Sequence, residues 1–222
     1  MPQRRRLRAP EIVKPLGDGV FNPLDRLTLA ENISDHLLKR QLMPLPPDRF
    51  RGAGIYAIYY VGDYPLYKKL ALSITSGENA IPLYVGKAIP PGSRKGALRL
   101  NANPGTALHK RLCDHRDSIK TTRDLKIEDF RCRYLLLDDV WIPLGESLLI
   151  YKFRPVWNIC VDGFGSHHQG GTRTTQKKSA WDTLHPGRGW ADHVTGENIK
   201  TAQLITDAIA AHIDRFISDN SN

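Results

Sequence analysis

The sequence reads GIYAIYYV over residues 54–61 and IPLYVGK over residues 81–87. Both stretches are rich in β-branched and aromatic residues, which predicts that each forms a strand. Side chains alternate along a strand, so in an antiparallel pair Tyr56 and Tyr84 could stand on the same face. A single strand tyrosine is usually an ordinary half-buried residue, so this pair gains meaning only together with reactive residues further along the chain.

Helix and strand signals continue on both sides of this pair. The connecting segment, residues 62–80, is long for a hairpin loop, and its middle (YKKLALSI) predicts a short helix. The other predicted elements are helices over residues 28–40, 105–120, 145–153 and 197–218, and a third strand over residues 131–137. This order of elements is typical of an α+β fold.

Length and composition narrow the class of protein. The 222 residues suffice for one decorated domain or two small ones, and 41% hydrophobic residues exclude a disordered chain. The three cysteines are far apart in sequence, which argues against a disulfide framework and a structural zinc site. No apolar run approaches the ~20 residues that span a bilayer, and no apolar segment follows the basic start. A reduced intracellular compartment is therefore expected, with no membrane contact.

The net charge of +9 is concentrated in two stretches of the chain. Residues 86–120 hold eight basic and two acidic residues, and residues 167–190 hold four basic and one acidic, while the rest of the chain is balanced. A local basic excess is what phosphate binding requires, because each neutralised phosphate releases condensed counterions. Charge alone fits an ordinary solvated surface equally well.

Four further residues could carry chemistry. Arg111 and His115 are four positions apart, so they share one face of the predicted helix. Glu146 lies near the start of an apolar helix, where a carboxylate is either a partner of the helix dipole or an oxygen ligand for Mg²⁺. Asn158 follows Pro155 and could equally be a turn residue. Each signal is modest by itself.

The order of these signals is informative. Gly-Ile-Tyr, Tyr-Val-Gly, Arg-x-x-x-His on a helix, Glu on a later helix and Pro-x-x-Asn together resemble the GIY-YIG nuclease family over roughly residues 54–158. The resemblance implies a small three-stranded antiparallel sheet flanked by helices. The N-terminal arm, the long hairpin insertion and the C-terminal helical extension resemble those of the family's type II restriction endonucleases. Among these, the chain is most similar to the dimeric enzymes that cut CCGCGG.

The resemblance implies a division of the chain into three parts. Residues 1–53 would form an N-terminal arm and helix for dimer or DNA contacts, and residues 54–160 the catalytic core. Residues 161–222 would supply a DNA-contacting loop and the C-terminal helix, all within one compact domain.

Two alternative functions remain: a homing or repair nuclease of the same fold, or a non-catalytic nucleic-acid-binding module.

The same resemblance implies hydrolysis of a DNA phosphodiester with one Mg²⁺ per site. Glu146 would hold the metal and Arg111 would stabilise the transition state. Tyr56 would activate water, but a tyrosine is a poor base at neutral pH, so Tyr84, His115 or the cation of Lys87 would have to assist. The sequence does not decide which of Tyr56, Tyr84 and His115 is the base. Asn158 would hold the site together by hydrogen bonds.

Reading a short palindrome requires basic and polar side chains outside this constellation. The candidates for DNA contacts are Arg94, Lys95, Arg99, His168, Gln169, Arg173, Lys177, Lys178 and Arg188. Most of them are expected to bind phosphates, since such contacts outnumber base contacts in protein–DNA interfaces. A palindromic site in double-stranded DNA implies a homodimer. The resemblance to restriction enzymes also implies a partner DNA methyltransferase of the same specificity, and a location in the cytoplasm of a prokaryotic cell.

Overall fold

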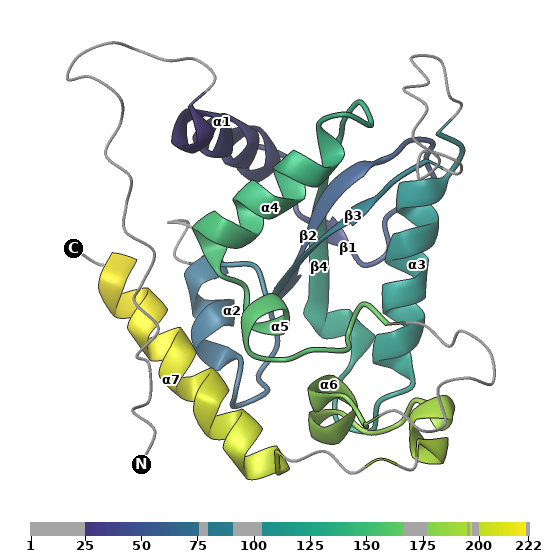
Figure 1. Ribbon diagram of the computed structural model, residues 1–222, viewed down its shortest axis with the longest axis vertical. Helices are drawn as coiled ribbons and strands as arrows, with labels where there is room; N and C mark the ends of the chain where they lie inside the picture. The colour runs from purple at the N-terminus through teal and green to yellow at the C-terminus, as the bar shows by residue number, and fades with distance from the viewer. Residues whose placement is uncertain are drawn as a thin grey trace, which may run out of the picture.

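A four-stranded antiparallel sheet forms the centre of the molecule, in the order β1-β4-β2-β3 (Figure 1). The computed structural model describes residues 25–75, 80–90, 104–166, 177–194, 196 and 200–220. The strands are β1 (Met43–Pro44), β2 (Gly54–Tyr60), β3 (Tyr84–Ala88) and β4 (Phe130–Leu136). The α-helices within these ranges are α1 (Arg26–Leu38), α2 (Lys68–Thr75), α3 (Ala107–Lys120), α4 (Ile142–Phe153), α5 (Val156–Ile159), α6 (Ala180–Leu184) and α7 (Ala202–Asn220).

The central strand β2 pairs with β3 on one side and with β4 on the other, and all seven of its residues are buried. In this register Tyr56 lies opposite Gly86, and Ile58 lies opposite Tyr84. Directly paired residues project to the same face of an antiparallel sheet. Tyr56 and Tyr84 therefore share a face as expected, with their ring centroids 6.2 Å apart.

The expectation of a three-stranded sheet is wrong by one strand. Met43 and Pro44 pair with Cys132 and Arg131 of β4 and add the short edge strand β1. A two-residue strand is too short to show a period-2 pattern. Proline is also a weak strand signal, because it cannot donate to the ladder and is tolerated only at an edge.

Helices cover both faces of the sheet (Figure 1). On one face, Leu37 of α1 and Leu149 of α4 pack against Ile55 of β2 in one buried cluster. The other face packs against α2, α3, α5, α6 and α7 in a second, larger cluster. The layers follow from the alternation of buried side chains in β2, which supplies one cluster with its even-numbered residues and the other with its odd-numbered ones.

The C-terminal helix α7 covers this larger cluster. Its buried residues Ile205, Ile209 and Ile213 recur every four positions, as a helix with one apolar face requires. The C-terminal helix expected from the sequence thus packs within its own chain. No helix in the described ranges has both the length and the apolar character to cross a membrane.

Candidate active site

Tyr56, Tyr84 and His115 meet on the face of the sheet covered by α3. The hydroxyl of Tyr56 lies 2.5 Å from Nε2 of His115, and both side chains are completely buried. The ring of Tyr84 lies 5.3 Å from the imidazole, centroid to centroid. Gly86 makes the arrangement possible, because a Cβ atom there would collide with the Tyr56 hydroxyl. The glycine of the Tyr84-Val85-Gly86 motif is thus a steric requirement of the buried phenol.

Burial decides the protonation state of the two tyrosines. It raises the pKa of Tyr56 well above the usual 10, and the neighbouring Tyr84 raises it further, while Arg111 opposes the shift. Burial also raises the pKa of Tyr84, again opposed by Arg111. At neutral pH both groups are therefore phenols. As a phenol, Tyr56 is able to donate its proton to an unprotonated Nε2 of His115.

Arg111 lies one helical turn before His115 on α3. Its Nη2 donates to the carbonyl oxygen of Gly165 at 2.8 Å, and its charge acts on both Tyr56 and Tyr84. The helix thus presents a cation and an imidazole to the same pair of tyrosines. A guanidinium held in this way has a fixed orientation and can donate bidentate hydrogen bonds to a phosphate group.

Glu146 reaches the site from α4, and its partner is Lys87 of β3. The Glu146 side chain is 18% exposed and that of Lys87 33%. Glu146 acts on the tyrosines electrostatically, because its charge raises the pKa of both Tyr56 and Tyr84. Strand alternation directs Lys87 towards α4 and away from the tyrosines. Lys87 was expected to supply their cation, but its partner is Glu146, and the charge of Arg111 is the one that acts on both tyrosines.

Asn158 secures the edge strand β3. Its Oδ1 accepts the backbone N–H of Val85 and its Nδ2 donates to the carbonyl oxygen of the same residue, both at 2.8 Å. The adjacent Trp157 donates its backbone N–H to Leu83 at 2.9 Å. One amide side chain thus satisfies both backbone groups of a residue between Tyr84 and Gly86. It holds the strand that carries Tyr84 and Lys87.

Comparison with known protein families identifies the domain. A family model described as the Eco29kI GIY-YIG domain matches residues 48–213. The chain belongs to this family. It is a family of GIY-YIG restriction endonucleases, so the protein is a DNA-binding and DNA-cleaving hydrolase. This confirms the resemblance inferred from the motifs and favours restriction over the homing and repair alternatives. No curated protein matches the chain.

The Eco29kI GIY-YIG match extends beyond Asn158 and includes a segment whose importance the sequence did not reveal. Phe164 is 1% exposed and stacks on the imidazole of His115, with ring centroids 4.5 Å apart. Its neighbour Gly165 accepts the hydrogen bond from Nη2 of Arg111. An aromatic residue between two glycines, Gly163 and Gly165, was the available signal, but glycines in such number predict only a loop.

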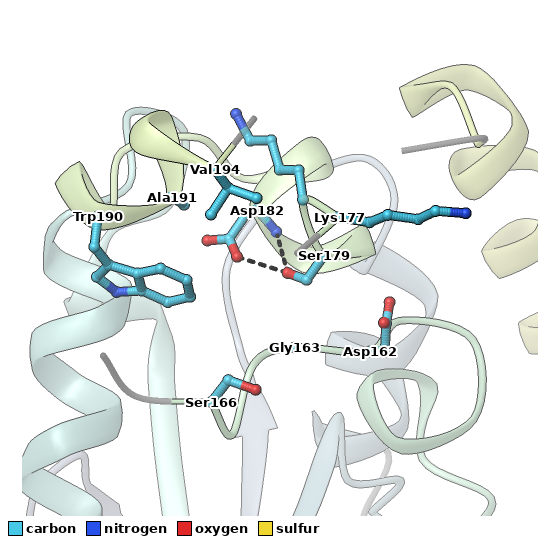
Figure 2. A pocket seen from close by; sticks show the side chains of 10 residues that line it. Asp162, Gly163, Ser166, Lys177, Ser179, Asp182, Trp190, Ala191 and Val194 are labelled. Carbon is cyan, nitrogen blue, oxygen red and sulfur yellow. Dashed lines mark hydrogen bonds between the residues drawn. The ribbon is translucent and has the colours of Figure 1, made fainter. Parts of the chain in front are cut away.

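The residues expected to contact DNA fall into three groups. Arg94, Lys95, Arg99, His168, Gln169 and Arg173 lie outside the described residues. Lys177 is exposed, and Lys178 lies 3.6 Å from Asp192 in a partly exposed ion pair. Both lysines line a cavity of about 240 Å³ with Ser179, Asp182 and Trp190 (Figure 2). The lining of this cavity does not include Tyr56 or Glu146.

Arg188 forms the third group, and it lies in the interior, where its partner is a buried carboxylate. Its side chain is buried at 4% exposure, and it binds Asp182 through Nε at 2.7 Å and Nη2 at 2.8 Å. The rings of Trp181 and Trp190 lie against the guanidinium, 4.4 and 4.8 Å from Cζ to the ring centroids. An arginine in a basic stretch has the same sequence signal whether it faces solvent or a buried carboxylate.

Replacing Arg188 by methionine is expected to lower the free energy of unfolding by about 3 kcal/mol, because Asp182 is left buried without its counter-ion. Urea denaturation of the variant and the wild type measures the difference. Lys178→Met is the matched control, because its ion pair is partly exposed and its loss is expected to cost less than about 1 kcal/mol. Equal losses in the two variants would contradict a structural role for Arg188.

Proposed function

We propose that this protein is an Mg²⁺-dependent type II restriction endonuclease that cuts double-stranded DNA at CCGCGG. The Tyr56–His115 contact beside Arg111 and Glu146, within an Eco29kI GIY-YIG domain, supports this proposal. Eco29kI itself cuts CCGCGG. The proposed reaction is attack of water on a backbone phosphate. Different side chains would accept the proton, stabilise the charge on the phosphate and hold the metal ion that stabilises the leaving group.

Tyr56 orients the attacking water in this proposal and passes its proton to His115. The raised pKa of Tyr56 argues against a free phenolate as the resting base. A phenol can instead donate its proton to Nε2 of His115 as it accepts one from water, so that no buried phenolate accumulates. The 2.5 Å separation of Oη and Nε2 supports this transfer.

Arg111 stabilises the phosphate as charge develops on its oxygens. Its Nη2 is held by the Gly165 carbonyl oxygen, which leaves its other donors to face the tyrosines and the substrate. A preorganised donor needs no reorientation during the reaction, which is the main source of such stabilisation. Tyr84 supports this arrangement from the adjacent strand.

Glu146 is the residue that would hold Mg²⁺. In the described ranges no three His, Cys, Asp or Glu side chains are grouped as a metal site. One carboxylate does fit an ion that takes its remaining ligands from water and substrate phosphate, as Mg²⁺ commonly does. When bound, the ion would polarise the phosphate and stabilise the leaving oxygen. Lys87 holds the carboxylate of Glu146 in place by their ion pair.

The proposed target also implies partners. CCGCGG is a palindrome, and two equivalent strands are cut most simply by a homodimer with one site per strand. A nuclease with this specificity requires a methyltransferase that protects the same sequence in the host. The proposed activity thus belongs in the cytoplasm of a prokaryotic cell.

Plasmid cleavage tests the proposal directly. A plasmid with one CCGCGG site is incubated with protein and Mg²⁺, beside an otherwise identical plasmid in which the site is altered by one base pair. We expect a single linear product from the first plasmid, no cutting of the second, and no cutting of either with a chelator. Cleavage of both plasmids would refute the specificity, and cleavage of neither would refute the enzymatic proposal. Sequencing the ends gives the stagger.

A further inference from the structure

The loop Gly163–Ser166 contacts three residues of the candidate active site. Phe164 stacks on His115, and its ring lies 5.0 Å from that of Tyr84, centroid to centroid. Gly165 holds Arg111 through its carbonyl oxygen at 2.8 Å. A Cβ atom on Gly165 would lie 2.8 Å from the Tyr84 hydroxyl and 3.2 Å from Nη2 of Arg111. The loop is thus packed directly against groups that the proposed reaction uses.

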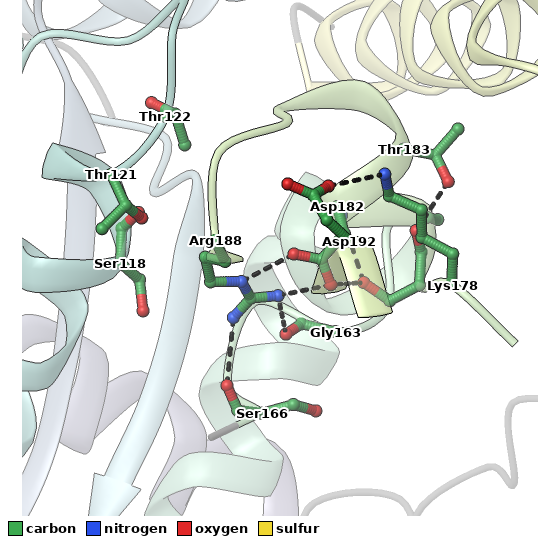
Figure 3. A network of polar contacts seen from close by, with 12 residues as sticks. Ser118, Thr121, Thr122, Gly163, Ser166, Lys178, Asp182, Thr183, Arg188 and Asp192 are labelled. Carbon is green, nitrogen blue, oxygen red and sulfur yellow. Dashed lines mark hydrogen bonds and ion pairs between the residues drawn. The ribbon is translucent and has the colours of Figure 1, made fainter. Parts of the chain in front are cut away.

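Arg188 holds this loop from its other side (Figure 3). Its Nη1 donates to the carbonyl oxygen of Ser166 and its Nη2 to that of Gly163, both at 3.0 Å. The two acceptors are the first and last residues of the loop. A single planar guanidinium therefore fixes both ends of the four-residue segment, while Phe164 and Gly165 between them face the site.

The guanidinium of Arg188 is itself held rigidly. Asp182 binds it through both carboxylate oxygens, and Ser179 donates its hydroxyl to one of these oxygens at 2.6 Å. Trp181 and Trp190 provide ring contacts to the same guanidinium. Because Arg188 and Asp182 are 4% and 1% exposed, water offers these charges no alternative partner.

We propose that Arg188 and the loop Gly163–Ser166 are positioning elements of the nuclease site, which orient Arg111 and His115 without touching DNA. This inference rests on the proposed function. The chain of contacts runs from Asp182 through Arg188 to the loop, and from the loop to the two α3 side chains. A displacement of about 1 Å in a reacting group can cost about 100-fold in rate, so a rigid support of this kind affects the chemical step.

Gly165→Ala tests the loop without disturbing the ion pair. Gly165 does not have a left-handed φ, so alanine fits its backbone, but the new methyl group would press on Tyr84 and Arg111. We expect the single-turnover cleavage rate at saturating DNA to fall about 100-fold. The Kd for CCGCGG DNA, measured with Ca²⁺ in place of Mg²⁺, and the melting temperature are expected to stay unchanged.

Gly189→Ala is the matched control. A Cβ atom on Gly189, next to Arg188, meets no atom within 4 Å. This variant is expected to cleave at the wild-type rate. Wild-type cleavage by Gly165→Ala would overturn the proposal, and so would a loss of DNA affinity equal to its loss of rate, because the loop would then be a DNA contact.

Arg188→Lys adds a second test at a temperature where the variant is shown to be folded. Lysine keeps the charge but not the planar fork that binds Gly163, Ser166 and Asp182 together. We expect a lower cleavage rate at saturating DNA with an unchanged KM, and an unchanged rate would overturn the role of Arg188. Arg111→Ala separates this outcome from failure of the proposed function, since its full activity would refute the proposed site itself.

Discussion

Glu146→Gln is expected to abolish DNA cleavage while DNA binding persists. Glutamine has nearly the same shape but lacks the negative charge that Mg²⁺ requires, and it leaves Lys87 without its ion-pair partner. We expect a loss of about 10³-fold or more in the single-turnover rate, equivalent to about 4 kcal/mol in the barrier. A time course of supercoiled plasmid cleavage with Mg²⁺ measures the rate, and a mobility-shift assay with Ca²⁺ measures binding.

Glu31→Gln is the control for this substitution. Glu31 is an exposed residue of α1, a helix that supplies none of the residues of the candidate site, so the same change of charge there is expected to leave the rate unchanged. Comparable cleavage by Glu146→Gln and the wild type would rule out Glu146 as the metal ligand. A parallel loss of DNA binding would instead assign it to substrate affinity.

Tyr56→Phe is expected to lower the cleavage rate by about 10³-fold, within the range that general acid–base groups contribute. The substitution removes only the hydroxyl that lies 2.5 Å from Nε2 of His115, so the water loses its contact with the proton acceptor. The pKa of Tyr56 is well above 10, so the wild-type rate should show no alkaline rise from its ionisation between about pH 6 and pH 9.

The chain offers a closely matched control in Tyr67→Phe. Tyr67 is also completely buried, and its hydroxyl lies 2.7 Å from Nε2 of another histidine, His185. It binds Trp157 at 2.9 Å and belongs to no part of the proposed proton path. This variant is expected to lose stability but to cut DNA at the wild-type rate. If both variants cut equally well, the phenol of Tyr56 is not part of the reaction.

Much of the fold could be predicted because its signals are local. The β-branched and aromatic residues of GIYAIYYV mark β2, and the four-residue spacing of Arg111 and His115 places both on one face of α3. The helix expected within residues 62–80 is present as α2. The helix expected over residues 145–153 begins earlier, at Ile142, because proline is accepted in a first turn. It ends at Phe153, before the residue that precedes Pro155, as expected.

The features that prediction missed depend on contacts between distant segments. β1 forms because it pairs with the edge of β4, and the sequence around Pro44 does not indicate that pairing. Lys87 was expected beside the tyrosines, yet α4 brings Glu146 to it from 59 positions away. Phe164 gains its importance only where the loop folds back onto α3.

The sequence by itself determined the family and predicted Tyr56, Tyr84, Arg111, His115 and Glu146 for the candidate site. Their spacing along strands and helices is a local property, and local periodicity dictates which side chains share a face. Only the tertiary structure decided the partners of each charge. Arg188 looked like one more phosphate ligand in a basic stretch, but burial makes Asp182 its counter-ion and the loop beside Arg111 its acceptor. The reason is that the environment of a charge is set by the packing of distant segments, which composition and spacing do not encode.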